Sequence, residues 1–308
     1  MELITIIMPA YNCEKTVSRS VESILKQTYK KFEVIIVNDG STDRTKSICE
    51  SFNDRRIKVI TTENGGPSAA RNVALKESKG KYIMFIDSDD IYIENALEVM
   101  LEKIEKDGYD IVTANYISFD KRNKKYYKRT KALETQKKND TYKYIDYLQN
   151  KGLFNTNWNK IYKSEIIKKN KILFDEKKEI GEDAKFNFEY MKYVKRCSYI
   201  SEAIYNYYLN DNGLTIKNKE SRAARLLNFF EDQLLYYEQQ KYPIDNIQLR
   251  IFKAFFSIND IDYIYGSKYC NIIDSINHKK WYLRSLNKWI KRKCDIRLKM
   301  LLKIYELL

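Results

Sequence analysis

The chain has 308 residues and a formal net charge of +14, so it is long enough to bury a sizeable core. No segment approaches the ~18 consecutive apolar residues of a membrane-spanning helix, and the apolar run Leu3–Met8 is typical of a strand rather than a signal peptide. The five cysteines form no Cys-x-x-Cys pair, which favours free thiols in a reducing compartment and a cytoplasmic location.

Apolar runs alternate with helical patterns over the first hundred residues, and this order predicts an α/β fold with a parallel sheet covered by helices. The expected strands are Leu3–Met8, Phe32–Val37, Ile57–Thr61 and Lys81–Ile86. Two helices are marked by apolar residues at three- and four-residue spacing, namely Val17, Val21, Ile24 and Leu25, and then Leu97, Met100, Leu101 and Ile104.

The loops after these strands contain small, polar or acidic residues, and in parallel sheets ligands bind beyond the carboxyl ends of the strands. Asp39 can accept hydrogen bonds from a ribose or a base, although it can equally cap a helix. A helix that begins after Gly65 and Gly66 favours anions, and Arg71 adds a positive charge to it. The chain contains neither a P-loop nor a Gly-x-Gly-x-x-Gly fingerprint.

The strand predicted over Lys81–Ile86 ends in the sequence Asp-Ser-Asp-Asp. Asp87 and Asp89 share one side of an extended backbone, and carboxylate oxygens placed this way suit Mg²⁺ or Mn²⁺. A divalent ion held there can bind the phosphates of a nucleotide. The alternative is an acidic turn that precedes a helix from about Glu94.

Together these motifs resemble the inverting glycosyltransferases of family 2, which have the GT-A fold and act in bacterial polysaccharide biosynthesis. The resemblance covers about the first third of the chain. It is carried by Ile6–Asn12, Val37–Asp43, Asn64–Asn72 and Phe85–Asp90. It implies a Rossmann-like, mostly parallel nucleotide-binding sheet flanked by helices, with a helical extension at the C-terminal end. It further implies that a nucleotide sugar is bound by Pro9, Ala10, Tyr11, Asp39, Gly66, Arg71 and Asp87. Asp89 would be the direct metal ligand, with Asp87 facing the ribose or a metal-bound water.

The catalytic base is expected further along the chain, and the single histidine, His278, lies far from every motif. Gly181-Glu182-Asp183 precedes a helical pattern, where acidic residues can simply complement the helix dipole. The segment also resembles the Glu-Asp motif that supplies the base in the family. By that resemblance Asp183 takes the proton from the acceptor hydroxyl.

Two later segments belong to the expected acceptor side. Asn157–Lys163 resembles a Lys-aromatic element of the family, although Trp158 is by default a core aromatic. Tyr205–Thr215 resembles a segment in which Arg often stands at the place of Tyr208 and Ser at the place of Gly213. The missing basic residue could be replaced by Lys217, Arg222 or Arg225. The charged segment Lys121–Asp140 is expected to be a loop.

The predicted organisation has three parts, a nucleotide-sugar-binding half over 1–110, an acceptor half with the base over 111–215, and a basic helical region over 216–308. Lys279–Lys303 contains ten basic residues and one acid beside an apolar stripe with Trp289. A basic amphipathic helix favours peripheral contact with an anionic membrane, here the cytoplasmic leaflet. The alternative is a terminal helix packed on its own domain.

The sequence therefore predicts an inverting transferase that depends on Mn²⁺ or Mg²⁺. It would move a hexose or N-acetylhexosamine, with UDP favoured by family habit, to a lipid-linked or surface glycan of a capsule, exopolysaccharide or lipopolysaccharide. A sugar nucleotidyltransferase is an alternative, but its Gly-rich, Arg-containing signature is missing where Pro9 to Tyr11 stand. A nucleic-acid-binding protein fits the charge and the 14% aromatic content, yet no recognised module appears, and no nucleic-acid partner is expected.

Overall fold

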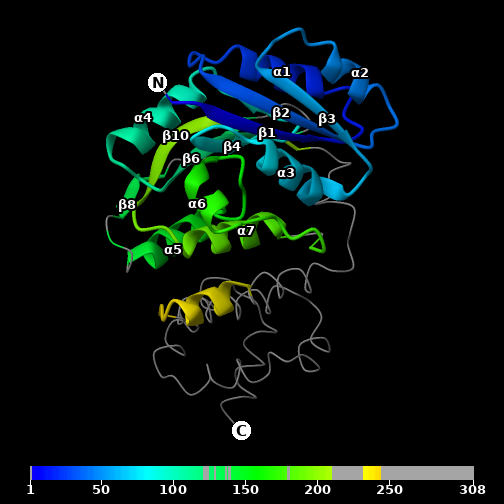
Figure 1. The fold of residues 1–308 in the computed structure, drawn as a ribbon. Helices are drawn as coiled ribbons and strands as arrows, with labels where there is room; N and C mark the ends of the chain where they lie inside the picture. Colours follow the sequence, from blue (N-terminus) through cyan, green and yellow to red (C-terminus); the bar gives the residue numbers. More distant parts are fainter. Residues whose placement is uncertain are drawn as a thin grey trace, which may run out of the picture. The chain divides into compact units, whose positions relative to one another are not determined.

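The fold was analysed in a computed structural model, which describes residues 2–120, 125–127, 130–135, 137, 140–178, 181–209 and 232–243. The chain divides into two compact units, Met1–Lys219 and Glu220–Leu308. In the second unit the described residues form a helix over 232–239, drawn in yellow in Figure 1. The basic segment Lys279–Lys303 and the candidate residues Lys217, Arg222 and Arg225 lie outside the described residues.

The first unit is built on one sheet whose strand order is β3-β2-β1-β4-β9-β6-β10-β5, with β7 paired to β6 and β8 paired to β10. In chain order the strands are β1 (Ile4–Ala10), β2 (Phe32–Asp39), β3 (Ile57–Thr62), β4 (Tyr82–Phe85), β5 (Ile91–Tyr92), β6 (Ile111–Phe119), β7 (Lys125–Tyr127), β8 (Leu133–Thr135), β9 (Lys160–Lys163) and β10 (Cys197–Tyr208).

The four strands predicted in the first hundred residues are confirmed, and β3, β2, β1 and β4 are parallel neighbours. The rest of the sheet is mixed. Strand β9 runs antiparallel to both β4 and β6, and β10 is parallel to β6. The segment Lys121–Asp140 was expected to be a loop, but β7 and β8 lie within it because they extend the sheet beside β6 and β10.

Among the described residues of the first unit, seven helices cover this sheet (Figure 1). They are α1 (Val17–Leu25), α2 (Thr45–Glu50), α3 (Gly66–Glu77), α4 (Ala96–Lys106), α5 (Thr141–Lys151), α6 (Ser164–Lys169) and α7 (Glu182–Met191). Helices α1, α2 and α4 lie on one face of the sheet, and α3, α5, α6 and α7 lie on the other. The helix expected from about Glu94 begins at Ala96, after the short strand β5.

Alternation along β1 explains both layers. Ile4, Ile6 and Met8 are fully buried in the cluster that also contains the apolar residues of α1 and α4. Ile7 points to the opposite face and is also fully buried, so apolar residues on both faces favour a central strand between two helical layers.

Aromatic rings pack on the face that carries α3 and α7. Phe85 at the end of β4 meets Phe174 edge-on at 5.4 Å and Phe186 edge-on at 5.8 Å, while Phe174 and Phe186 stack at 4.2 Å. These rings therefore pack β4 against α7 and against the segment that carries Phe174.

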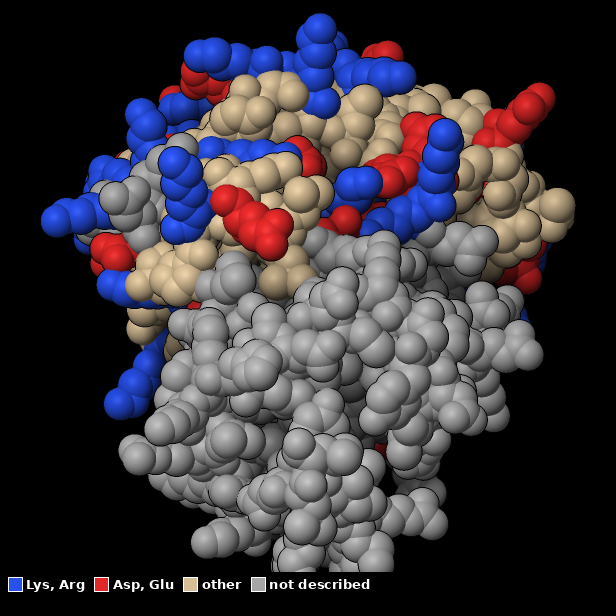
Figure 2. Space-filling view, turned by 90° about the horizontal axis from the view of Figure 1, so that it is seen from below, with Lys and Arg blue, Asp and Glu red and all other residues tan. Residues whose placement is uncertain are grey.

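The face shown in Figure 2 has basic and acidic side chains interspersed over the described residues. Among the helices of the described ranges, none is long and apolar enough to cross a membrane.

Candidate active site

The loops after β1 and β2 are held together by hydrogen bonds at the carboxyl end of the parallel strands. The Asn12 backbone N–H donates to Ser41 Oγ at 3.1 Å, and the Thr42 backbone N–H donates to Asn12 Oδ1 at 2.9 Å. Beside them Pro9 is half-buried and Ala10 is buried, whereas the Tyr11 side chain is 50% exposed. An exposed ring on a fixed loop can stack on a nucleobase.

Asp39 connects the end of β2 to the start of α3. Its Oδ1 accepts a hydrogen bond from the Gly65 N–H at 2.8 Å, and its Oδ2 accepts one from the Gly66 N–H at 2.9 Å. Asp39 is 3% exposed, and each carboxylate oxygen keeps a second lone pair beside this contact. Gly40 permits the approach, because its φ is +67° and a Cβ there would lie 2.8 Å from the Asn64 nitrogen.

The three aspartates after β4 have different environments. Asp90 is fully buried, and its oxygens accept hydrogen bonds from the Tyr205 hydroxyl at 2.9 Å and the Tyr208 backbone N–H at 2.8 Å. Burial, reinforced by the charges of Asp87 and Asp89, raises the pKa of Asp90 well above its usual range. Asp90 therefore fixes the loop to β10 and leaves Asp87 and Asp89 as the partly exposed carboxylates.

Asp87 and Asp89 fit a Mg²⁺ or Mn²⁺ ion that is shared with a substrate. Asp87 is 29% exposed, and only its Oδ1 is engaged by Arg71. No cluster of three or more His, Cys, Asp or Glu side chains within the described residues has metal-binding geometry. Mg²⁺ is commonly bound through one or two carboxylates, with phosphates and waters completing its coordination. Such an ion would neutralise charge on a diphosphate leaving group.

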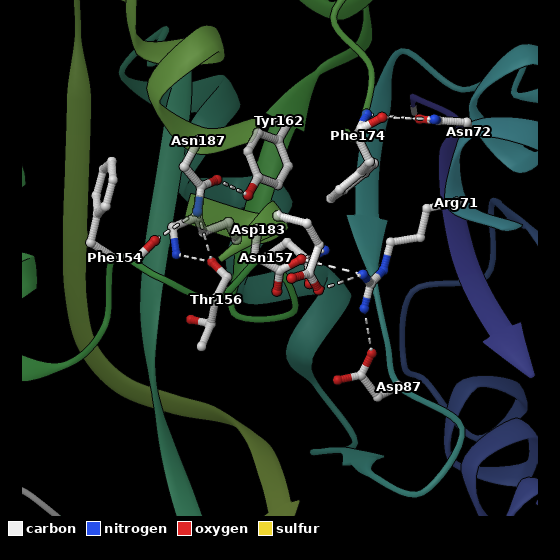
Figure 3. Close-up of polar contacts among 12 residues, drawn as sticks. Arg71, Asn72, Asp87, Phe154, Thr156, Asn157, Tyr162, Phe174, Asp183 and Asn187 are labelled. Carbon is white, nitrogen blue, oxygen red and sulfur yellow. Dashed lines mark hydrogen bonds and ion pairs between the residues drawn. The ribbon is translucent and has the colours of Figure 1, made fainter. Parts of the chain in front are cut away.

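Arg71 connects the aspartate loop, which is the segment Asp87–Asp90 after β4, to the start of α7 (Figure 3). The residue is 4% exposed; its Nη2 lies 3.0 Å from Asp87 Oδ1, and its Nη1 lies 3.3 Å from Asp183 Oδ1 and 3.4 Å from Glu182 Oε1. Burial alone would lower the pKa of Arg71, but the charges of these three carboxylates outweigh it and raise that pKa. The guanidinium also lies over the Phe174 ring, at 5.3 Å from its centroid.

Asp183 lies in the first turn of α7, which is entered through Gly181 at a φ of +83°. Its side chain is 15% exposed, and Asn157 Nδ2 donates a hydrogen bond to Asp183 Oδ1 at 2.9 Å. Burial raises the pKa of Asp183 to about 8; the charge of Arg71 opposes this shift, while Glu182 and Asp87 add to it. A carboxylate poised near neutral pH and held by two donors has the properties of a general base.

The structure thus brings Asp87, Arg71 and Asp183 into one network, as Figure 3 shows. The sequence analysis placed Arg71 only among the nucleotide-binding residues. In the structure it contacts the carboxylates of both acidic motifs. The predicted nucleoside contacts of Pro9, Ala10, Tyr11, Asp39, Gly66 and Arg71 remain predictions.

Sequence reasoning missed two further side chains. Asn157 holds Asp183, but the sequence marked it only as the first residue of the Lys-aromatic segment Asn157–Lys163, with no role of its own. Its neighbour Trp158 is 5% exposed and stacks on Tyr205 at 4.4 Å, as a core aromatic does. Arg19, on α1, lies over the Tyr208 ring at 4.3 Å and donates from Nη2 to the Asp89 carbonyl oxygen. A cation therefore lies beside Tyr208, where the family often has arginine.

Several curated relatives are similar in sequence to this chain, and three of them follow. It is 31% identical over 240 residues to the uncharacterized glycosyltransferase EpsJ of Bacillus subtilis, covering 76% of this chain and 70% of EpsJ. It is 31% identical over 254 residues to the glycosyltransferase GlyA of Streptococcus pneumoniae, covering 79% of this chain and 36% of GlyA. The third is WfgD of Escherichia coli, a UDP-Glc:α-D-GlcNAc-diphosphoundecaprenol β-1,3-glucosyltransferase, 44% identical over 115 residues that make up 37% of this chain and 46% of WfgD. The chain thus spans less than half the length of GlyA and of WfgD.

Solved structures share the fold. Residues 1–349 of Staphylococcus aureus TarS in complex with UDP-GlcNAc align with a TM-score of 0.66 and 27% identity, over 84% of this chain and 74% of that one. The family description "Glycosyl transferase family 2" matches residues 5–170, which is more than half of the chain. These residues contain the aspartate loop, Arg71 and Asn157, and the chain belongs to glycosyl transferase family 2.

Proposed function

We propose that this glycosyltransferase moves a hexose or N-acetylhexosamine from a UDP-sugar to a lipid-linked or surface glycan in a bacterium, with inversion at the anomeric carbon. WfgD is named for a UDP-glucose donor and a diphosphoundecaprenol-linked acceptor, and TarS is named as a poly(ribitol-phosphate) β-N-acetylglucosaminyltransferase. The name of WfgD and the TarS complex with UDP-GlcNAc support a UDP-sugar donor, and both names support an acceptor that carries phosphate.

The observation that carries the proposal is the position of Asp183 in one ion network with Asp87. Asp183 accepts the proton of an acceptor hydroxyl as that oxygen attacks the anomeric carbon, and the bond from that carbon to the UDP oxygen breaks on the opposite face. Arg71 holds both carboxylates, so the donor side and the base keep a fixed relation. Bound Mn²⁺ or Mg²⁺ supplies the positive charge that the departing diphosphate requires.

A screen of nucleotide sugars tests this function directly. With Mn²⁺ present, a UDP-hexose or UDP-N-acetylhexosamine should raise the melting temperature and be slowly hydrolysed, because a ligand that binds the native state stabilises it. GDP-, CMP- and dTDP-sugars serve as the control donors in the same screen. If none of the UDP-sugars stabilises the protein while another nucleotide class does, the uridine assignment is wrong.

The metal assignment predicts that Asp89→Ala weakens Mn²⁺-dependent UDP-sugar binding at least tenfold and leaves the fold intact, because Asp89 is partly exposed. Calorimetry with and without Mn²⁺ measures the change. Asp107→Ala, at the end of α4, removes an aspartate of the same unit away from the site and should bind as the parent does. Unchanged metal dependence in Asp89→Ala would move the ligand role to Asp87.

The raised pKa of Asp183 predicts the pH dependence of the reaction. A general base is active only when it is deprotonated, so kcat/KM should fall tenfold per pH unit as the pH drops below about 8 and should level off above it. Initial rates between pH 5.5 and 9.5 with constant ionic strength and saturating Mn²⁺ measure this limb. A flat profile down to pH 6 would contradict the assignment.

Peripheral membrane contact through the basic segment is also part of the proposal. The ten basic residues of Lys279–Lys303 should attract an anionic bilayer by about 1 kcal/mol per well-placed charge, before desolvation and screening. Removal of Lys279–Leu308 should abolish cosedimentation with phosphatidylglycerol vesicles at low salt and spare UDP-sugar binding. If the intact protein ignores these vesicles, or the shortened chain is insoluble, the segment packs on its own domain.

A further inference from the structure

A cavity of about 530 Å³ lies beside the outer half of β6, in a part of the first unit that the donor site does not use. Its walls come from β6, from β7, and from the chain around the end of α5. The lining residues are Asn115, Tyr116, Ser118, Lys125, Tyr126, Tyr127, Thr130, Lys151 and Leu153.

The lining has the chemistry of a carbohydrate site. Tyr126 and Tyr127 are 47% and 43% exposed, so their rings offer apolar faces to the C–H groups of a sugar. Ser118 adds a hydroxyl group that can exchange hydrogen bonds with sugar hydroxyls. Asn115 and Thr130 are already hydrogen-bonded to each other, and they also bond Ser201 and Tyr199. A wall of rings with a few placed polar groups is the usual composition of a small-molecule site.

The charge of the cavity is positive. Lys125 is exposed, and Lys151 lies near the Tyr147 ring at 5.7 Å; neither lysine is ion-paired within the described ranges. One carboxylate lies beside the lining, because the Tyr126 hydroxyl donates to Asp120 Oδ2 at 3.1 Å. Two ammonium groups, with no carboxylate among the described lining residues, favour a ligand with negative charge.

Packed side chains connect the lining of the cavity to Asp183. The Tyr116 ring meets Trp158 edge-on at 4.9 Å, and the preceding residue, Asn157, holds Asp183. Leu153 is fixed as well, because the buried Lys160 Nζ donates to its carbonyl oxygen at 2.8 Å.

Figure 3 places the same segment relative to the donor side. Phe154 and Thr156 lie on one side of Asp183, and Arg71 and Asp87 lie on the other. The segment that follows the lining residue Leu153 therefore lies on the side of Asp183 away from the donor carboxylates.

We propose that this cavity is the acceptor subsite and that Lys125 and Lys151 select a saccharide bearing a phosphate or carboxylate group. The assignment of the cavity to the acceptor rests on the proposed function. The recognition of an anionic saccharide rests on the lining alone, so it can be measured without turnover.

Three soluble probes with one octyl chain each separate the two sources of charge. They are octyl N-acetylglucosaminyl diphosphate, octyl glucuronide and the uncharged octyl N-acetylglucosaminide. Saturation-transfer NMR titrations at low salt should give a dissociation constant at least tenfold lower for one or both anionic probes than for the uncharged one. The diphosphate probe identifies phosphate as the recognised group, and the glucuronide identifies carboxylate.

The double variant Lys125→Gln with Lys151→Gln should lose this preference, so that all three probes bind within about threefold of one another. The matched control, Lys76→Gln with Lys106→Gln, makes the same change in net charge on exposed positions of α3 and α4 and should keep it. Lys125→Arg with Lys151→Arg keeps the charge and should also retain it. UDP-sugar stabilisation and hydrolysis should be unchanged in all three variants.

The inference is overturned if the wild-type chain shows no anionic preference, or if the glutamine pair retains it. Loss of the preference in both the glutamine pair and the control pair would mean a nonspecific charge effect and would overturn it as well. If the preference depends on the two lysines but no nucleotide sugar is bound or hydrolysed, the cavity is an anionic-saccharide site and the proposed function alone is wrong.

Discussion

Asp183→Asn should lower turnover by about 10²- to 10⁴-fold, the usual contribution of a general base, and should leave the affinity for UDP-sugar nearly unchanged. Asparagine keeps the volume of the side chain and can still accept from Asn157, which donates to Asp183 at 2.9 Å. It cannot take the acceptor proton. The loss should therefore appear in kcat, because the donor residues on β1, β2 and β4 are not changed.

Glu182→Gln provides the control for this experiment, since Glu182 is the neighbouring carboxylate and also contacts Arg71, at 3.4 Å. Steady-state rates with a fixed acceptor, together with calorimetric donor binding, separate the two variants. If Glu182→Gln loses turnover and Asp183→Asn keeps it, the base is Glu182.

Arg71→Met should destabilise the first unit by about 3–5 kcal/mol, which is the usual effect of removing one partner from a buried ion network. Methionine fills part of the space beside Phe174 but leaves Asp87, Glu182 and Asp183 facing one another without a cation. The destabilisation should be larger at pH 8 than at pH 5, because proton uptake relieves repulsion among the carboxylates.

Urea unfolding followed by circular dichroism at both pH values measures this effect. Arg44→Met is the control, because Arg44 is 81% exposed in its pair with Glu14 and such pairs contribute little to stability. Arg71→Lys should recover only part of the loss, since one ammonium cannot replace a guanidinium that contacts three carboxylates through two nitrogens. A midpoint for Arg71→Met equal to that of Arg44→Met would show that the network is not needed for folding.

The first half of the fold could be predicted because its signals are local. Burial on both faces makes β1 and β2 continuous apolar runs, and α1 and α4 show their buried faces at helical spacing. Strand β9 could not be predicted in this way. Its four residues, Lys160–Lys163, include two lysines, and one of them is fully buried because Leu153, Thr156 and Asn159 supply oxygens to its ammonium group.

The candidate site was predictable as a set of carboxylates but not as a network. Asp87, Asp89 and Asp183 stand at the ends of recognisable elements. The contact from Arg71 to Glu182 joins residues 111 positions apart, and no local pattern encodes such a pair. The same holds for Asp90, whose partner Tyr205 lies 115 positions away and gives that carboxylate a structural role that its neighbours do not share.

The place of β9 in the sheet has a consequence for engineering. This strand comes from the later part of the first unit, yet it lies between β4 and β6 and covers the edge of β4 at Tyr82, Ile83 and Met84. A fragment ending near residue 110 would expose that apolar edge as a template for intermolecular pairing. Chimeric enzymes that exchange donor specificity should therefore carry Lys160–Lys163 together with the first hundred residues. Otherwise the β4 edge of the transferred part must pair with the β9 strand of the enzyme that receives it.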